Sequence, residues 1–143
     1  MSDPFHLQRF VEAQESSWTA ALAEVRAGRK RSHWIWFIFP QMRGLGLSST
    51  SEFYGIVSLD EARAYLAHPV LGPRLAAIAE AVLAHQGQSA NAIFGSPDDM
   101  KLRSSMTLFD AASVDGANPY RAVLRHFFDG VPDPRTLELL GTS

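Results

Sequence analysis

The chain has 143 residues, the length of a single domain, and 46% of them are hydrophobic while 20% are charged, as in ordinary globular proteins. It contains no cysteine, which excludes disulfides, thiolate nucleophiles and cysteine-ligated metal centres. Its net charge is −2, and its only basic run, Arg29-Lys30-Arg31, is too short for a nucleic-acid-binding face. We therefore expect one domain over residues 1–143 that does not bind nucleic acid.

The hydropathy pattern indicates a cytoplasmic protein without membrane association. The N-terminus lacks the charged-then-apolar pattern of a signal peptide. The longest uninterrupted apolar run, residues 34–40, is far shorter than the ~20 residues that span a bilayer.

Helix starts are marked by residues that cap an N-terminus. Four capping residues stand directly before a proline, which suits the first helical position because it has no N–H: Asp3-Pro4, Ser96-Pro97, Asn118-Pro119 and Asp133-Pro134. Ser58 and Glu61 have the spacing of a capping box. His68, before a proline, predicts the end of one helix and a cap for the next. Helix ends are predicted at four glycines, Gly28, Gly87, Gly130 and Gly141.

Between these marks, apolar residues recur every three or four positions, as in amphipathic helices. The predicted helices span residues 4–14, 16–27, 50–56, 59–67, 70–86, 97–112, 119–129 and 134–140. Pro73 favours a start near Gly72 for the fifth of them, since proline is tolerated in a first turn. We predict an all-α, compact multihelical single domain of about seven to eight helices around an aromatic core segment.

The most informative segment is residues 33–41 (HWIWFIFPQ), which holds two of the three tryptophans and leads directly into a loop rich in glycine and serine over residues 41–49. An apolar wall beside a few placed polar atoms favours a ligand pocket, and a core segment followed by an ordinary loop is the alternative. A lone strand here would have no backbone partner, so we predict a short helix or turn wedged into the core.

The predicted helix over residues 97–112 carries a polar face. Asp98, Lys101 and Ser105 fall at i, i+3 and i+7 and therefore on one side, and Ser104 flanks them. A lysine beside hydroxyl groups can bind an anion such as phosphate. The alternative is a surface ion pair of Asp98 with Lys101, worth ~0–1 kcal/mol.

The loop after the aromatic segment supplies further candidates. Gly44 and Gly46 let the backbone approach a ligand, and Arg43 with successive N–H groups can hold an anion, although the loop matches no phosphate-binding motif. Glu52 is a candidate general acid or base if the loop lines a cleft. An ordinary tight connection and a solvated helix face are the alternatives. The five histidines lack metal-binding spacing, so we expect no metal site and no cofactor.

Three motifs together carry a family resemblance. They are HWIWFIFPQ at residues 33–41 with Gly44-Leu45-Gly46, then YLAHPVLG at residues 65–72, then Ile93-Phe94-Gly95 with Asp98, Lys101 and SSMTLF at residues 104–109. Over nearly its whole length the chain resembles the bacterial and fungal family catalogued as domain of unknown function 1810. The resemblance implies a compact, mainly helical domain and no established activity. Members are sometimes labelled calpastatin-like, but strong apolar periodicity argues against a disordered inhibitor segment.

A more distant similarity is to the NADAR family, which resembles enzymes acting on N-glycosidic bonds of ADP-ribose derivatives. It is carried by the order of the aromatic–proline segment, residues 51–54 (SEFY) and a helix with Gly95, Lys101 and Met106. This similarity implies Glu52 as the acid/base, Trp34 or Trp36 as a stacking surface, and Arg43 with Lys101 as phosphate contacts.

Two hypotheses for function follow. The first is a pocket for a small anionic ligand of the nucleotide or ADP-ribose type, which the protein could also hydrolyse at an N-glycosidic bond. Glu52 is then the candidate catalytic residue, and the candidate ligand-binding residues are Trp34, Trp36, Gln41, Arg43, Gly44, Gly46, Ser48, Tyr54, Asp98, Lys101, Ser104 and Ser105. The second is a non-catalytic protein-interaction or self-association module with an exposed apolar patch. In a third interpretation, the shared motifs are mostly core and helix caps.

Overall fold

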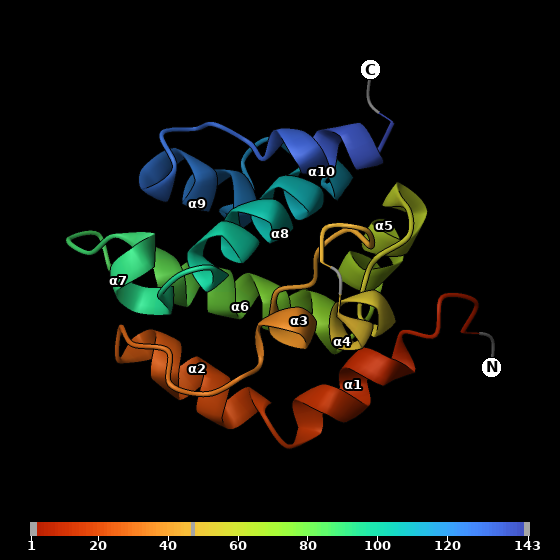
Figure 1. Cartoon of the computed structure of the whole chain (residues 1–143), viewed down its shortest axis with the longest axis horizontal. Coiled ribbons are helices and arrows are strands. Elements are labelled where there is room, and N and C mark those ends of the chain that lie inside the picture. The colour runs from red at the N-terminus through yellow and green to blue at the C-terminus, as the bar shows by residue number, and fades with distance from the viewer. Residues whose placement is uncertain (1–2, 47, 142–143) are drawn as a thin grey trace.

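A computed structural model describes residues 3–46 and 48–141, so Leu47 of the predicted loop lies outside the described residues. This part of the chain forms ten helices and no strand (Figure 1): α1 (Gln8–Glu15), α2 (Trp18–Arg26), α3 (Ile35–Ile38), α4 (Ser49–Phe53), α5 (Leu59–Ala67), α6 (Leu71–Leu83), α7 (Ala90–Phe94), α8 (Asp98–Ala112), α9 (Pro119–Phe127) and α10 (Pro134–Leu139). The prediction of an all-α multihelical domain is confirmed. The number of helices exceeds the eight predicted ranges because α3 and α7 are short additional helices.

Helix α8 forms the centre of the domain. It packs against α3, α5, α7, α9 and α10, while α6 packs against α2, α5 and α9. In Figure 1, α9 and α10 lie on one side of α8, and α1 and α2 lie on the opposite side of the molecule. Leu102, Met106 and Phe109 of α8 are completely buried. This burial fixes the polar first turns of α8 close to the aromatic segment.

The aromatic segment is a short helix inside the core, as predicted. Trp34 and Ile38 are each only 1% exposed, and the Trp34 ring meets Phe94 edge-on with 6.2 Å between ring centroids. The side-chain amide of Gln14 donates hydrogen bonds to the Phe37 carbonyl at 2.8 Å and to the Tyr65 hydroxyl at 3.0 Å. These buried bonds connect α1 to the aromatic segment and to α5.

An isolated backbone bridge closes the loop that follows. Met42 and Ile56 pair in parallel, with the Arg43 N–H donating to the Ile56 carbonyl and the Ile56 N–H to the Gln41 carbonyl, both at 2.8 Å. Gly55 allows this approach, because a Cβ there would come within 2.7 Å of the Arg43 Cα. The two ends of the segment that contains α4 are therefore held together.

Several predicted caps are confirmed. Side-chain oxygens of Ser58, Asn118 and Asp133 accept hydrogen bonds from backbone N–H groups three residues later, at 3.1, 2.9 and 3.0 Å respectively. His68 ends α5, and its Nδ1 accepts from the N–H groups two and three residues later, at 3.1 and 3.2 Å. The predicted stops Gly28, Gly130 and Gly141 have φ angles of 75°, 75° and 70°, which suit glycine.

Other predicted boundaries are wrong. The first helix begins at Gln8 and not at residue 4, because the Asp3 carboxylate accepts from N–H groups four and five residues further on and caps the helix from a distance. Ser96 does not cap α8, since Pro97 itself occupies the cap position without a side-chain hydrogen bond. Gly87 does not end α6, which stops at Leu83. The helix predicted over 50–56 ends at Phe53, because the chain must turn into the backbone bridge.

Two local details also differ from prediction. Helix α7 was not predicted, because five residues are too few for an apolar period, although Ser89 caps it by accepting from the Ala92 N–H at 3.0 Å. Glu61 does not complete a capping box with Ser58. One Glu61 carboxylate oxygen accepts from the Val57 N–H at 2.9 Å, and the other pairs with Arg9 at 2.8 Å.

Among the described residues, no single helix combines the length and apolar composition needed to cross a membrane. Helices α5 and α6 meet that criterion only when taken as a pair, and they meet at an angle of 90°.

Candidate functional site

A cleft lies between α3 with the loop after it and the first turns of α8. Its volume is about 360 Å³, and we call it the α3–α8 cleft. In Figure 1 the segment after α3 passes close to α8 on its way to α4. The residues that line the cleft are Trp36, Gln41, Leu45, Gly46, Ser48, Ser51, Pro97, Met100, Lys101, Ser104 and Asp133. Six residues singled out in the sequence are therefore brought together here, namely Trp36, Gln41, Gly46, Ser48, Lys101 and Ser104.

Lys101 places a cation on the aromatic wall of the cleft. Its ammonium lies 5.2 Å from the centroid of the Trp36 ring and 3.5 Å from Oδ1 of Asp98. The other oxygen of Asp98 pairs with Lys30 at 2.8 Å, and the Lys30 ammonium lies 4.9 Å from the Trp34 ring centroid. The Lys101 side chain is 29% exposed. The ammonium therefore remains accessible to a ligand while the ion pair with Asp98 restricts its position.

The opposite wall comes from the loop and the start of α4. No hydrogen bond within the described residues engages the side-chain amide of Gln41, which is half-buried on this wall. Gly46 lies so close to Ser51 that a Cβ would come within 2.5 Å of the Ser51 Oγ. The Ser48 Oγ accepts from the Ser51 N–H at 3.1 Å and caps α4. The Gln41 amide is therefore the polar group of this wall that is free to bind a ligand.

Asp133 completes the lining and was not predicted to do so. Its Oδ2 accepts hydrogen bonds from the Ser104 hydroxyl at 3.2 Å and from the Thr136 N–H at 3.0 Å. Sequence analysis identified Asp133 only as a helix cap, and that role is confirmed. Its second role arises because α10 packs on α8, a long-range contact for which the sequence carries no local signal.

Three predicted residues do not line the cleft. Trp34 is buried, and its indole N–H donates to the Glu24 carboxylate at 3.0 Å. Tyr54 lines a small recess of about 10 Å³ next to Trp36 and Gln41. Ser105 is completely buried, and its hydroxyl has no hydrogen-bond partner among the described residues. It does not belong to the cleft lining.

Arg43 and Glu52 lie in a different depression, which we call the N-terminal hollow. Its volume is about 520 Å³, and it is bordered by the segment before α1, by Arg9 and by Glu61. The Arg43 guanidinium and the Glu52 carboxylate are 3.7 Å apart, and both side chains are more than half exposed. Gly44 faces Leu139, at 3.6 Å from the position of a Cβ. The structure thus separates Glu52 from the Lys101 side of the predicted pocket.

Arg9 has a structural role in the N-terminal hollow. Its guanidinium donates to the carbonyls of Phe5, His6, Phe53 and Gly55 as well as to Glu61, at distances of 2.6 to 3.2 Å. All of its nitrogens are therefore engaged in holding the segment before α1 and the end of α4 together.

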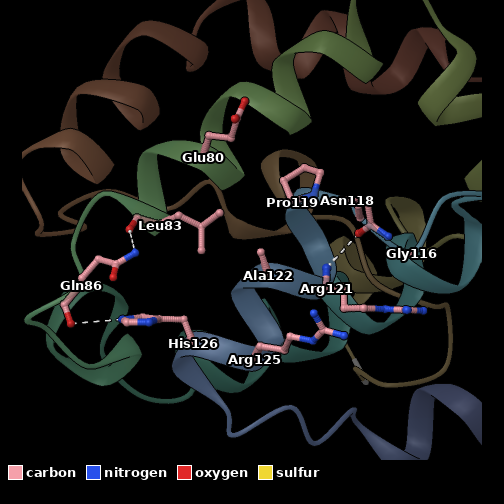
Figure 2. Close-up of a pocket in the computed structure, with 11 residues that line it drawn as sticks. Glu80, Leu83, Gln86, Gly116, Asn118, Pro119, Arg121, Ala122, Arg125 and His126 are labelled. Atoms are coloured by element: carbon pink, nitrogen blue, oxygen red, sulfur yellow. Dashed lines mark hydrogen bonds between the residues drawn. The ribbon is translucent and has the colours of Figure 1, made fainter.

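A third depression, the α6–α9 hollow, has a volume of about 700 Å³ (Figure 2). Two of its polar side chains are engaged by other protein groups. Arg121 Nε donates to both oxygens of Asp110 at 3.0 and 3.2 Å, and His126 Nε2 lies 3.1 Å from the Gln86 carbonyl. Figure 2 shows Glu80 on the opposite side of the hollow from Arg121 and Arg125. Size alone does not make it the better candidate, because Arg121 and His126 are already engaged by other groups of the protein.

The surroundings of Glu24 and Tyr120 shift the pKa values of these two buried or partly buried groups. Burial acts to raise the pKa of Glu24, but hydrogen bonds from the Ser32 hydroxyl, the Arg31 N–H and the Trp34 indole outweigh it and lower the pKa from 4.5 to about 2. Burial, with a smaller contribution from the Glu80 charge, raises the pKa of Tyr120 to about 12. Glu24 is therefore a firmly ionised anchor for the Trp34 side chain.

The described part of the chain contains no group of three or more histidine, cysteine, aspartate or glutamate side chains placed to hold a metal ion.

Comparison with known proteins gives a family without an assigned activity. The structure superposes on the crystal structure of the conserved hypothetical protein Rv1873 from Mycobacterium tuberculosis with a TM-score of 0.95 and 51% sequence identity, covering 99% of this chain and 100% of that chain. No curated protein matches the sequence. These comparisons do not show the similarity to the NADAR family. The family described as "Protein of unknown function (DUF1810)" matches residues 4–140, and the chain belongs to this family.

Proposed function

We propose that the α3–α8 cleft binds a small anionic ligand of the nucleotide or ADP-ribose type. The observation that carries the proposal is the Lys101 ammonium held beside the partly exposed Trp36 ring on the wall of a cleft of about 360 Å³. Ligand sites combine apolar and aromatic walls with a few placed polar groups, in volumes of roughly 300–1,000 Å³.

The chemistry of the lining supports a ligand with both a ring and a charge. An ammonium group binds phosphate oxygens by charge-assisted hydrogen bonds, and an indole offers a flat apolar surface to a base. The Gln41 amide supplies a donor and an acceptor, which matches the edge of a heterocycle. The Gln41 amide gives up no hydrogen bond within the described residues to do so, whereas the Lys101 ammonium keeps its pairing with Asp98 at 3.5 Å.

The proposal concerns binding and does not include hydrolysis. The acid/base role expected for Glu52 requires its carboxylate to reach a ligand in the α3–α8 cleft, but Glu52 lines the N-terminal hollow with Arg43. A general acid must lie within hydrogen-bond reach of the group that it protonates.

The alternative of an interaction module has one observation in its favour. Phe53 and Val57, which are 52% and 54% exposed, both border the N-terminal hollow. Light scattering over a range of protein concentrations tests self-association through this region. A Phe53→Ser variant that abolishes association would favour the module over the ligand site.

Calorimetric titration with ADP, ADP-ribose and AMP tests the ligand proposal. Lys101→Met keeps the length of the side chain and removes its charge, so we expect affinity to fall about tenfold or more. Lys30→Met is the matched control, because Lys30 pairs with the same Asp98 but does not line the cleft. It should leave affinity within about twofold.

A thermal-shift measurement supports the titration, because a ligand at one hundred times its Kd stabilises the folded state by about 2.7 kcal/mol. Absence of binding by all three nucleotides, or equal affinity of the wild type and Lys101→Met, would contradict the proposal.

A further inference from the structure

Several hydrogen bonds hold the carboxylate of Asp133 in place, and one of its two oxygens is not engaged by them. Its backbone N–H donates to the Thr107 hydroxyl at 2.9 Å, and its Oδ2 accepts from the Thr136 hydroxyl at 2.5 Å in addition to the Thr136 N–H and Ser104. Within residues 3–46 and 48–141, Oδ1 accepts no hydrogen bond, and Asp133 lines the α3–α8 cleft. Asp133 therefore combines a fixed carboxylate with an oxygen that no described group engages, on a residue that lines the cleft.

An ionised carboxylate can only accept hydrogen bonds, so it selects the donors of a ligand. Phosphate oxygens are repelled by it, whereas sugar hydroxyls can donate to it. Carboxylates that accept from ribose hydroxyls recur in nucleotide-binding sites. The 2′-hydroxyl is also the group by which proteins distinguish ribonucleotides from deoxyribonucleotides.

The two charges that line the cleft come from different elements, Lys101 from α8 and Asp133 from the N-cap of α10. Ser104, which donates to Asp133, stands three residues after Lys101 on α8 and so lies about 4.5 Å further along the helix axis. The cleft thus has a cationic position at Lys101 and an anionic position beside Ser104. A nucleotide has the matching order, with an anionic phosphate attached directly to a sugar that donates hydrogen bonds.

We infer that Asp133 makes the site selective for ribonucleotides over nucleotides that lack the ribose hydroxyls. This inference rests on the proposed function, since it concerns a ligand in the same cleft. Asp133 acts as a specificity-determining acceptor, and Thr136 is the positioning residue that holds its carboxylate, while the single Ser104 hydroxyl proton is shared between Asp133 Oδ2 and the Met100 carbonyl, both at 3.2 Å. The ligand class is therefore narrowed to a nucleotide with a free ribose hydroxyl.

The test compares ADP with 2′,3′-dideoxy-ADP by calorimetric titration of the unaltered full chain. We expect the dideoxy analogue to bind about tenfold more weakly, as for the loss of hydrogen bonds to a charged group. In Asp133→Asn this ratio should fall toward one, because the cap bonds from Thr136 retain the amide oxygen and leave an NH2 group, which cannot accept, in the place of Oδ1. Asparagine is as good an N-cap as aspartate, so α10 is expected to persist.

The possible outcomes separate the failure of this inference from the failure of the proposed function. Equal affinity of the unaltered chain for both nucleotides would overturn the inference and leave the proposed function standing. An unchanged tenfold ratio in Asp133→Asn, with circular dichroism showing a folded protein, would also overturn it. If neither nucleotide binds the unaltered chain, the inference is overturned for ADP, and the proposed function fails as well when ADP-ribose and AMP also do not bind. The comparison on the unaltered chain does not depend on any variant folding.

Discussion

The ammonium group of Lys101 lies 5.2 Å from the centroid of the Trp36 ring, and this pair joins α8 to the aromatic segment. Lys30 and Trp34 form a second pair with a separation of 4.9 Å, and Asp98 binds both lysines. The only two lysines of the chain are thus gathered around one carboxylate. A cation–π contact contributes about 0.5–2 kcal/mol according to its exposure, so this arrangement is both a support of the fold and a wall of the cleft.

Removal of the central carboxylate should therefore destabilise the protein. The Lys30 side chain is only 6% exposed, and Asp98→Ala would leave its buried ammonium without an anion. We expect the free energy of unfolding to fall by about 3 kcal/mol, as when one partner of a buried ion pair is removed. Urea denaturation measures this loss. A loss below about 1 kcal/mol, the range of exposed pairs, would show that water solvates the Lys30 ammonium.

Ser105→Ala should have the opposite effect on stability. The Ser105 hydroxyl is completely buried and has no hydrogen-bond partner in the described part of the chain. Since an unsatisfied buried polar group costs about 1–3 kcal/mol, its removal should raise the free energy of unfolding by about 1 kcal/mol. Affinity for ADP should not change. Weaker ADP binding in a variant of unaltered stability would place Ser105 in the ligand site after all.

Gln41→Ala should leave the fold intact and weaken the binding of the ligand. The amide makes no hydrogen bond within the described residues, so its loss leaves no described protein group without a partner. We expect the melting temperature to change by little and the affinity for ADP to fall about fivefold, as for one neutral hydrogen bond. A large drop in melting temperature would instead indicate a structural role for this amide.

The pH dependence of stability should show the contribution of Glu24. Its pKa is lowered from 4.5 in an ordinary environment to about 2 in the folded protein, so its ionised form stabilises the fold above pH 4.5. This contribution is lost as the pH falls from 4.5 to about 2, where the folded state must also take up the proton. The melting temperature of the wild type should therefore fall across this window more steeply than that of Glu24→Gln. Parallel curves would contradict the assignment.

Most of the fold could be predicted because its signals are local. Caps such as Asn118 act within one turn, and apolar periodicity marks each long helix. Prediction of the cleft requires knowing how the helices pack against one another, which the sequence of a single helix does not contain. With 100° of rotation per residue, the cleft-lining residues of α8, among them Met100 and Ser104, centre on a direction about 90° away from Ser105. Packing of α8 selected that direction, so Ser104 faces the cleft while Ser105 turns into the core.

The separation of Glu52 from Lys101 could not be predicted for a related reason. In the sequence, Glu52 follows the loop directly, and nearness to the loop suggested nearness to the site. The backbone bridge between Met42 and Ile56 instead places Arg43 and Glu52 on the N-terminal hollow. Asp133 enters the cleft only because α10 packs against α8.

The most direct measurement follows the three indole N–H signals in an NMR titration of the ¹⁵N-labelled protein with ADP. Trp36 lines the cleft, and Trp34 is buried with its N–H bound to Glu24. Trp18, on α2, lies against Arg74 of α6. We predict that the Trp36 signal moves in a saturable way while the Trp18 signal stays fixed. A Trp36 signal that does not move with millimolar ADP would contradict ligand binding in the α3–α8 cleft.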